Sequence, residues 1–383
     1  MENLPLELNT NILTRLPVKT LGQLKCVSKP FKTLITTHHF SKTHLTKTPF
    51  KPQLLLSTST LHTLNIFHQN HQSPPQPLPL QIPSYPFNLC GEAIQLVGSC
   101  NGLVCLYCPP NTYCLLNPTT REFRVLPDPG RFPGDARIRL SGFGYVEKCD
   151  DYMVVSIGTD NTGVGNSVIR VYPGRGDSWK TVVARVPFRV FPWVKPVYVN
   201  GVVHWLGFGG KFPPSNKIMG FDFAKEEFRV LPLSGDMNER GVKALGVLGG
   251  CVCVLLRDRA LVLEMWMMME YGDRESWIRT LSIGGSYSTD PITYIFPICY
   301  VEEKVLLLVD NETLVLYDPV VRVTECLAVK PRGRENTMDV IVYEESIVSP
   351  YGYICQDHLD RRNVAVKQKE RYATSLTFTI TLC

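Results

Sequence analysis

Apolar residues within the first forty positions recur with the spacing of short amphipathic helices. A first stripe has the i, i+4, i+5, i+8 spacing of one helical face and ends before Pro17: Leu8, Ile12, Leu13 and Leu16. A second short stripe contains Leu21, Leu24 and Val27. Ser28 is positioned to cap a third helix, with Pro30 in its first turn. Three such helices are too small to close a good core alone, so we expect this unit to complete its core against a partner.

From residue 96 onward, short apolar segments that begin at a turn recur about every fifty residues, a period typical of repeat architectures. These segments start at Asn101, Asp151, Asn200, Gly250 and Glu303. Each is followed by a second strand-like element of one of two types. The first type has Asp or Asn after an apolar residue and then an amphipathic return, as in 116–127, 221–232 and 317–327. The second type carries Ser-Trp, at 178–179 and 276–277.

Strand pairs with this period indicate a β-propeller or kelch-like array, in which small sheets stack into a continuous core. The segment 54–67 alternates loosely and predicts early strands, whereas 36–50 is rich in Thr, His and Lys and suggests helix ends and a connector. Thr374–Leu382 alternates with period two and predicts a last strand that closes the ring against an early one. The fold class is therefore α+β multidomain: a small three-helix unit followed by an all-β propeller.

The composition of the chain indicates which cellular compartment to expect. The chain is 44% hydrophobic and 20% charged, and it contains no run of about 18 apolar residues, so we expect no membrane span. The N-terminus lacks the basic flank and apolar segment of a signal peptide. Most of the 13 cysteines lie in apolar, strand-like runs, as expected of small core residues in a reduced compartment, either cytoplasm or nucleus.

Charge is unevenly distributed. Residues 1–50 hold seven Lys or Arg and two acidic residues, which accounts for the whole net charge of +5 and leaves the remaining chain neutral. A basic head on a neutral body fits an acidic protein partner. Nucleic acid is the rival interpretation, but no basic-aromatic stripe or recognised binding motif supports it.

Candidate chemistry is sparse, and we predict no catalytic residue, metal or cofactor. Cys105-Leu-Tyr-Cys108 superficially suggests zinc, but no second pair follows at finger spacing. Gly142-Phe-Gly144 lacks the third Gly of a nucleotide loop. His204 lies in an alternating strand and is expected to be a structural histidine. Several tryptophans could form the base of a sugar-binding site, but we expect them to pack between sheets. The methionines at 267–269 are expected to fill the core.

The N-terminal residues resemble the F-box, through which substrate receptors dock onto the Skp-type adaptor of cullin-based (SCF) ubiquitin ligases. The match comprises Leu4-Pro5-x-Glu-Leu8, Ile12-Leu13-x-Arg-Leu16-Pro17 and Val27-Ser-Lys-x-Phe31, where Phe31 replaces a common Trp. A plain helical cap on a larger domain is the alternative. The resemblance implies these adaptor-binding residues: Leu4, Pro5, Leu8, Ile12, Leu13, Leu16, Pro17, Val27 and Phe31.

The body resembles the plant F-box-associated domain, type 1. The resemblance is carried by Ser141-Gly-Phe-Gly-Tyr145, Asn200-Gly-Val-Val-His-Trp205, Phe221-Asp-Phe and the segment 264–277, and it is strongest over 95–330. Val146 and Met153 depart from the family pattern. The predicted domains are 1–45, the F-box; 46–94, a connector with early strands and a Pro/Gln-rich loop; and 95–383, the propeller-like domain.

Together the two resemblances imply a non-catalytic substrate receptor of an SCF ligase, bound to a Skp-type adaptor and through it to cullin and RING subunits. A protein target of unknown identity would be held for ubiquitination and degradation by propeller loops, for which 128–140, 158–167, 207–217 and 284–292 are candidates. Two alternatives remain: a propeller scaffold without ligase function, and a propeller enzyme or lectin acting on sugars.

Overall fold

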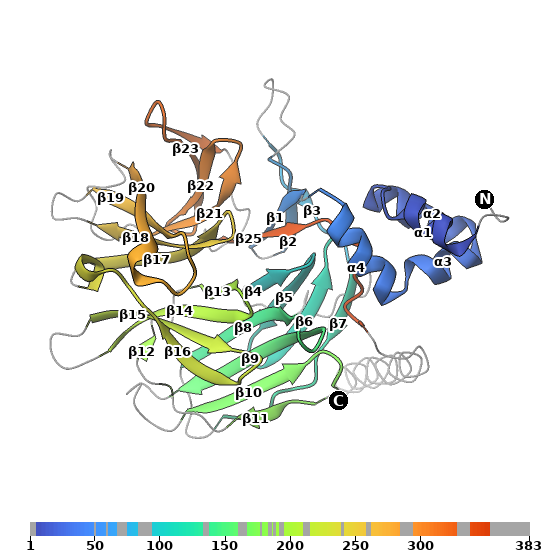
Figure 1. The fold of residues 1–383 in the computed structure, drawn as a ribbon, viewed down its shortest axis with the longest axis horizontal. Helices are drawn as coiled ribbons and strands as arrows, with labels where there is room; N and C mark the ends of the chain where they lie inside the picture. The colour runs from blue at the N-terminus through green and yellow to red at the C-terminus, as the bar shows by residue number, and fades with distance from the viewer. Residues whose placement is uncertain are drawn as a thin grey trace, which may run out of the picture. The chain divides into compact units, whose positions relative to one another are not determined.

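The structure is a computed structural model that describes residues 5–49, 51–58, 60–66, 75–82, 94–132, 138–159, 167–176, 178–182, 186, 189–190, 195–209, 215–238, 241–257, 262–283, 294–327 and 338–352. The chain divides into two compact units, residues 1–350 and 351–383, and every element below belongs to the first. Helices come first and strands follow (Figure 1).

Four helices open the chain: α1 (Leu6–Leu13), α2 (Val18–Val27), α3 (Lys29–Ile35) and α4 (His38–Lys47). Pro5 and Pro17 occupy the N-cap positions of α1 and α2. Ser28 is the N-cap residue of α3 as predicted, with Pro30 in the first turn, but its side chain makes no capping hydrogen bond. The first three helices thus match the helices expected from the apolar stripes.

The fourth helix corrects the expectation of helix ends and a connector in this region. The Thr37 side chain caps α4 by accepting a hydrogen bond from Phe40 N at 3.3 Å. Phe40 and His44 are fully buried one helical turn apart, and His44 Nε2 donates to the Leu16 carbonyl oxygen at 2.9 Å. The helix therefore has a buried face that its Thr-, His- and Lys-rich composition obscured.

The strands form six antiparallel sheets, the blades of a β-propeller (Figure 1). Blade 1 contains β1 (Pro52–Ser57), β2 (Leu61–Leu64), β3 (Leu78–Pro79) and β25 (Asp339–Glu344). Blade 2 contains β4 (Gln95–Cys100), β5 (Leu103–Cys108), β6 (Thr112–Asn117) and β7 (Glu122–Val125). Blade 3 contains β8 (Ile138–Val146), β9 (Asp151–Thr159), β10 (Val168–Pro173) and β11 (Lys180–Val182).

The other three blades follow in chain order. Blade 4 contains β12 (Arg189–Val190), β13 (Val197–Val199), β14 (Val202–Gly209), β15 (Ser215–Asp222) and β16 (Glu227–Leu231). Blade 5 contains β17 (Gly241–Leu248), β18 (Cys251–Arg257), β19 (Leu263–Met268) and β20 (Trp277–Ile283). Blade 6 contains β21 (Ile295–Val301), β22 (Lys304–Val309), β23 (Thr313–Asp318) and β24 (Val323–Leu327). Short 3-10 helices are η2 (Gly235–Asn238) and η3 (Arg274–Ser276).

The ring is closed by a strand from near the end of the described chain. β25 pairs antiparallel with β1, with Leu54 opposite Val342, and β1 pairs on its other edge with β2. Successive inner strands contact one another in the order β25, β4, β8, β13, β17, β21 and back to β25. The propeller strands therefore begin at Pro52, and closure uses 339–344, whereas the strand predicted at 374–382 lies outside the described residues.

The fifty-residue repeat has a conformational cause. Each repeated segment is the second strand of a blade, entered through a tight turn whose residues have positive φ. Asn101 and Gly102 have φ of 52° and 77°, and Asn200 and Gly201 have φ of 52° and 76°. Asn and Gly adopt this left-handed conformation at low cost, so the sequence marks these hairpins.

The two types of second element also have separate structural roles. In blades 2, 4 and 6 the Asp or Asn side chain closes the turn between the last two strands; Asp222 Oδ1, for example, accepts from the backbone N–H groups of Ala224 and Lys225. In blades 3 and 5 the Trp ties its blade to the preceding one. Trp179 Nε1 donates to the Pro127 carbonyl oxygen at 2.6 Å, and Trp277 Nε1 to that of Pro232 at 2.9 Å.

Candidate functional site: an exposed apolar face on the N-terminal helices

The N-terminal helices have a core that is completed within this chain. Leu13, Leu21, Ile35 and Phe40 are at most 1% exposed, and they pack together with Ile347, which follows the closing strand of the propeller. We expected this unit to complete its core against a partner. Instead, α4 and Ile347 supply the missing apolar surface, so the exposed apolar residues are surplus to the core.

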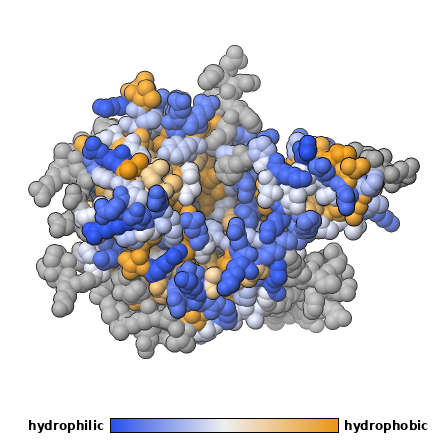
Figure 2. Space-filling view, in the orientation of Figure 1, coloured by the Kyte–Doolittle hydropathy of each residue, from blue (hydrophilic) through white to orange (hydrophobic). Residues whose placement is uncertain are grey.

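Large apolar side chains remain on the surface of these helices. Leu8 and Ile12 lie one turn apart on α1 and are 49% and 39% exposed. Leu6, at the start of α1, is 68% exposed, and Val27, at the end of α2, is 77% exposed. Figure 2 shows apolar side chains gathered on these helices. Burial of such a set against a partner would contribute about 1.5–3 kcal/mol per fully buried side chain.

The structure sorts eight of the nine predicted adaptor-binding residues into three groups. Pro5, Leu8, Ile12, Pro17 and Val27 are exposed and available to a partner. Leu16 and Phe31 are half-buried against the helical core, and Leu13 lies inside it. Leu4 lies outside the described residues. Sequence reasoning missed Leu6, which stands beside the Leu4-Pro5 pair but outside the i, i+4 stripe. Adaptor contact by any of these residues stays a prediction.

The N-terminal segment that carries this apolar face is basic. Arg15, Lys19, Lys29 and Lys32 are exposed, and Glu7 is the one acidic side chain between residues 5 and 49. A partner surface that combines an apolar groove with acidic side chains would complement both properties.

An ionic cluster joins α4 to blade 3. Lys42 Nζ donates to Asp150 Oδ1 at 2.9 Å and to the Tyr145 hydroxyl at 3.2 Å. Arg175 Nη2 donates to Asp150 Oδ2 at 3.0 Å, and His38 Nδ1 lies 3.8 Å from the same oxygen. The hydrogen bond to Asp150 raises the pKa of Lys42, whereas burial lowers the pKa of His38. These contacts tie the last helix to the propeller.

The inner strands of the propeller begin at one end, here called the strand-start end, and finish at the opposite strand-finish end. At the strand-start end, Leu96 N donates to Asp339 Oδ2 at 2.8 Å. At the strand-finish end, Gly102 lies against the Glu344 carbonyl. The helices connect at the strand-finish end, because β1 begins at Pro52, which is opposite Glu344.

Three of the predicted recognition loops have described residues at their ends, and these residues lie at the strand-start end. The segment 128–140 leads into β8, 158–167 joins β9 to β10, and 207–217 joins β14 to β15; each meets the strands at this end. The segment 284–292 lies outside the described residues. The helical surface and these three loops thus belong to opposite ends of the propeller topology.

The residues considered for chemistry have structural roles. Gly142-Phe-Gly144 lies within β8, where a Cβ at Gly144 would overlap Tyr198. His204 is fully buried, with Nε2 2.8 Å from the Tyr271 hydroxyl, and burial lowers its pKa to about 4. His204 is thus a buried strand histidine, as predicted.

The remaining aromatic and methionine residues are largely packing residues as well. Trp205 and Trp277 are buried, and Trp179 and Trp266 pack against core clusters. Met267 and Met268 are buried, but Met269 is 51% exposed, so the methionine run fills core at two of its three positions.

The Cys-x-x-Cys sequence does not bring its two thiols together. Cys105 and Cys108 are three residues apart on β5, so their side chains leave opposite faces of the sheet. Cys105 packs in the core between blades 2 and 3, and Cys108 in the core between blades 1 and 2. Burial raises the pKa of Cys105 and Cys114. Within the described ranges, no group of three His, Cys, Asp or Glu side chains is arranged to hold a metal ion.

The helices of the described chain are also too short or too polar to cross a membrane.

Comparisons with known proteins agree with this architecture. A family model described as the F-box domain matches residues 1–43, and one described as the F-box associated beta propeller domain matches residues 56–350. The chain is 27% identical over 349 residues to F-box protein CPR1 of Arabidopsis thaliana, covering 83% of this chain and 82% of that protein. It is 29% identical over 333 residues to F-box/kelch-repeat protein At3g23880 of the same plant, covering 82% and 88%.

Proposed function

Because the chain belongs to the family of F-box proteins with an F-box associated beta propeller domain, we propose that it is a substrate receptor of an SCF ubiquitin ligase. In this role the helices bind a Skp-type adaptor, and through it cullin and RING subunits. The propeller holds a target protein for ubiquitination and degradation. We place this activity in the cytoplasm or nucleus, where the buried free cysteines would stay reduced.

The observation that carries the proposal is the surplus apolar surface of the helices. Leu8, Ile12 and Val27 remain exposed although Phe40 and Ile347 have already completed the helical core. Exposed apolar side chains grouped in this way mark interaction sites. The basic character of the same segment favours an acidic partner.

The division between the two ends of the propeller supports the receptor role. The helices join at the strand-finish end, and the predicted recognition loops 128–140, 158–167 and 207–217 meet the strands at the strand-start end. A target bound there would not compete with the adaptor for surface. The mechanism is proximity: a held target presents its lysines at high effective concentration to the charged E2 enzyme.

The receptor itself needs no catalytic group for this mechanism, and we assign none. Thiol chemistry would require a thiolate near a base or cation. Cys105, Cys114 and Cys253 have the opposite environment, because burial in apolar surroundings raises the pKa of each thiol.

A pull-down of the full chain with a purified Skp-type adaptor tests the proposal. The double variant Leu8→Asp/Ile12→Asp should lose the adaptor, because two charges would enter an apolar interface. Val230→Asp is the matched control: Val230 is 50% exposed on the outer strand β16, and its substitution should leave binding intact. Failure of the wild-type chain to retain the adaptor would favour the alternative, a propeller scaffold without ligase function.

A further inference from the structure

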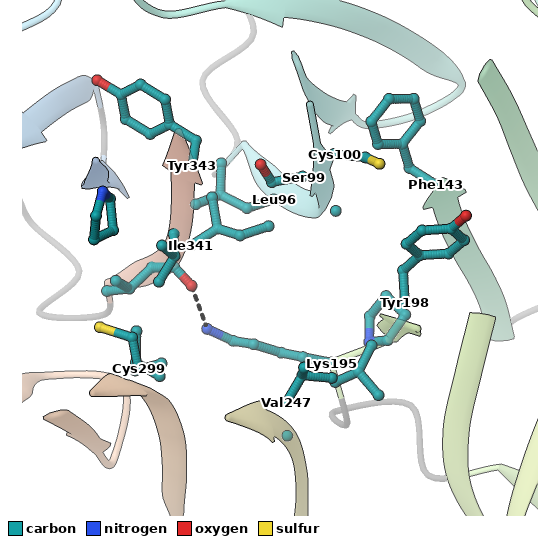
Figure 3. A pocket seen from close by; sticks show the side chains of 18 of the residues that line it. Leu96, Ser99, Cys100, Phe143, Lys195, Tyr198, Val247, Cys299, Ile341 and Tyr343 are labelled. Carbon is teal, nitrogen blue, oxygen red and sulfur yellow. Dashed lines mark hydrogen bonds between the residues drawn. The ribbon is translucent and has the colours of Figure 1, made fainter. Parts of the chain in front are cut away.

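A cavity of about 770 Å³ lies at the centre of the propeller (Figure 3). Its wall contains residues from the inner strand of every blade: β25, β4, β8, β13, β17 and β21. The volume is within the range of sites that bind small molecules, about 300–1,000 Å³. Because the wall is drawn from six sheets that support one another, the site is preformed.

Two glycines on the inner strands let large aromatic side chains pack against the neighbouring strands, so that these side chains do not occupy the centre. Gly98 on β4 allows Phe143 to approach: a Cβ at Gly98 would lie 3.1 Å from Phe143 Cβ. Gly144 on β8 accommodates the Tyr198 ring, whose hydroxyl donates to the Tyr145 carbonyl oxygen. Figure 3 shows both rings at the margin of the opening rather than across it. These large side chains therefore line the cavity without filling it.

At the strand-start end, the positive charge of the cavity wall is already neutralised. Lys195 Nζ forms an ion pair with Asp339 and lies 3.5 Å from the Val340 carbonyl oxygen. It also stands 5.6 Å from the centre of the Phe296 ring. A ligand anion would have to compete with Asp339 for this ammonium group.

At the strand-finish end, Glu344 is among the residues that line the cavity, and its carboxylate forms no ion pair with the described part of the chain. Burial raises the pKa of Glu344. Burial, and secondarily the Glu344 carboxylate, also raises the pKa of Cys100 to about 12. A half-buried carboxylate in apolar surroundings is stabilised when it gains a cation or hydrogen-bond donor.

We propose that the central cavity binds an amphipathic small molecule, with its apolar body among the inner strands and an ammonium group against Glu344. The cavity wall is largely aliphatic and aromatic, with Leu96, Val247, Phe296 and Ile341 among its members. An anionic amphiphile is disfavoured at both ends, by Glu344 at one and by the existing pair at the other. This inference concerns a site distinct from the helical surface and does not depend on adaptor binding.

Calorimetric titration of the full chain with decylamine and, separately, with decanoate at pH 7.5 tests the charge preference. These probes share an apolar chain and differ in the charge of the head group. We expect decylamine to bind saturably. Decanoate should bind at least about tenfold more weakly than decylamine, because one charge-assisted hydrogen bond contributes free energy on this scale. Equal binding of both, stronger binding of decanoate, or no decylamine binding would overturn the proposal.

Two variants locate the site. Glu344→Gln should weaken decylamine binding about tenfold and remove the preference over decanoate, whereas Glu303→Gln, an exposed carboxylate on a turn at the same end, should change neither. Val247→Phe should weaken decylamine binding by placing an aromatic ring at the cavity wall, and Val230→Phe on the outer strand should not. Unchanged binding in Glu344→Gln or in folded Val247→Phe would contradict this assignment, and the adaptor pull-down would be unaffected by either result.

Discussion

Lys195, just before β13 in blade 4, forms an ion pair with Asp339, the first residue of the closing strand β25 in blade 1. The two blades stand three positions apart in a ring of six, so the pair spans the centre of the propeller. Asp339 Oδ2 also accepts from Leu96 N at 2.8 Å in blade 2. One carboxylate thus ties the closing strand to two other blades.

Loss of this pair should destabilise ring closure. We expect Asp339→Asn, which keeps the side-chain shape, to lower the free energy of unfolding by about 1–2 kcal/mol, because the ion pair is only partly buried. Urea unfolding of Asp339→Asn, Lys195→Met and the double variant measures the coupling between the two residues. Strictly additive effects would show that the pair makes no contribution.

Substitutions of Leu8 and Leu13 should affect different properties, adaptor binding for Leu8 and stability for Leu13, although both residues belong to one apolar stripe. Leu13→Ala removes a side chain that is 1% exposed and should cost about 2–5 kcal/mol of stability. Leu8→Ala removes a side chain that is 49% exposed and should leave stability nearly unchanged while weakening adaptor binding. Thermal unfolding followed by circular dichroism, paired with the pull-down, checks both. Similar losses of stability in the two variants would refute the distinction.

Asn117 forms hydrogen bonds both within a turn and to the segment that follows the closing strand. Its substitution should therefore lower the free energy of unfolding more than substitution of Asp222, its counterpart in blade 4. Its Oδ1 accepts from Thr119 N at 2.8 Å, and its Nδ2 donates to the Val348 carbonyl oxygen at 2.7 Å, beyond the closing strand. We expect Asn117→Ala to cost about 2–3 kcal/mol, because buried partners are left unsatisfied. Asp222→Ala, which loses only the turn bonds, is the control. Equal costs measured by urea unfolding would argue against a closure role.

The free energy of unfolding should decrease as the pH is lowered below neutrality, because His204 is buried in its neutral form. Burial lowers its pKa from 6.5 to about 4 in the folded chain, so the unfolded chain binds the proton more readily. The stabilisation is complete above pH 6.5 and is lost as the pH falls toward 4, by up to about 1.4 kcal/mol per pH unit. Glu344 and Asp151, whose pKa values are raised by burial, act in the opposite direction.

Comparison with His204→Gln isolates the histidine contribution. Urea unfolding at pH 7.5 and pH 5.5 should show a smaller loss in the variant than in the wild type. The same loss in both proteins would mean that other groups cause the pH dependence.

The repeat was readable from sequence because its turns need particular residues. Asn101-Gly102 and Asn200-Gly201 adopt positive φ, so hairpins appear as a periodic signal. Ring closure was not readable, since alternation shows that a segment can form a strand but not which strand it pairs with. Alternation alone therefore favours the cleaner pattern at 374–382 over the short segment 339–344 as the last strand.

The helical site was predictable in kind but not in detail. Leu8 and Leu13 satisfy one helical spacing equally well, and only packing against Phe40 and Ile347 decides which is buried. Neither packing residue was foreseeable, because one lies in a polar helix and the other follows the last strand. The central cavity was also hidden, since its lining residues come from all six blades and are brought together only when the ring closes.

The most direct test of the account is the dissociation constant of the full chain for a purified Skp-type adaptor, measured for the wild type and for Ile12→Ala. Ile12 is 39% exposed, and its loss should weaken binding by about tenfold or more without lowering the unfolding temperature of the propeller. Saturable wild-type binding with this loss would support a ligase receptor. An absence of wild-type binding, or equal affinity in both proteins, would contradict it.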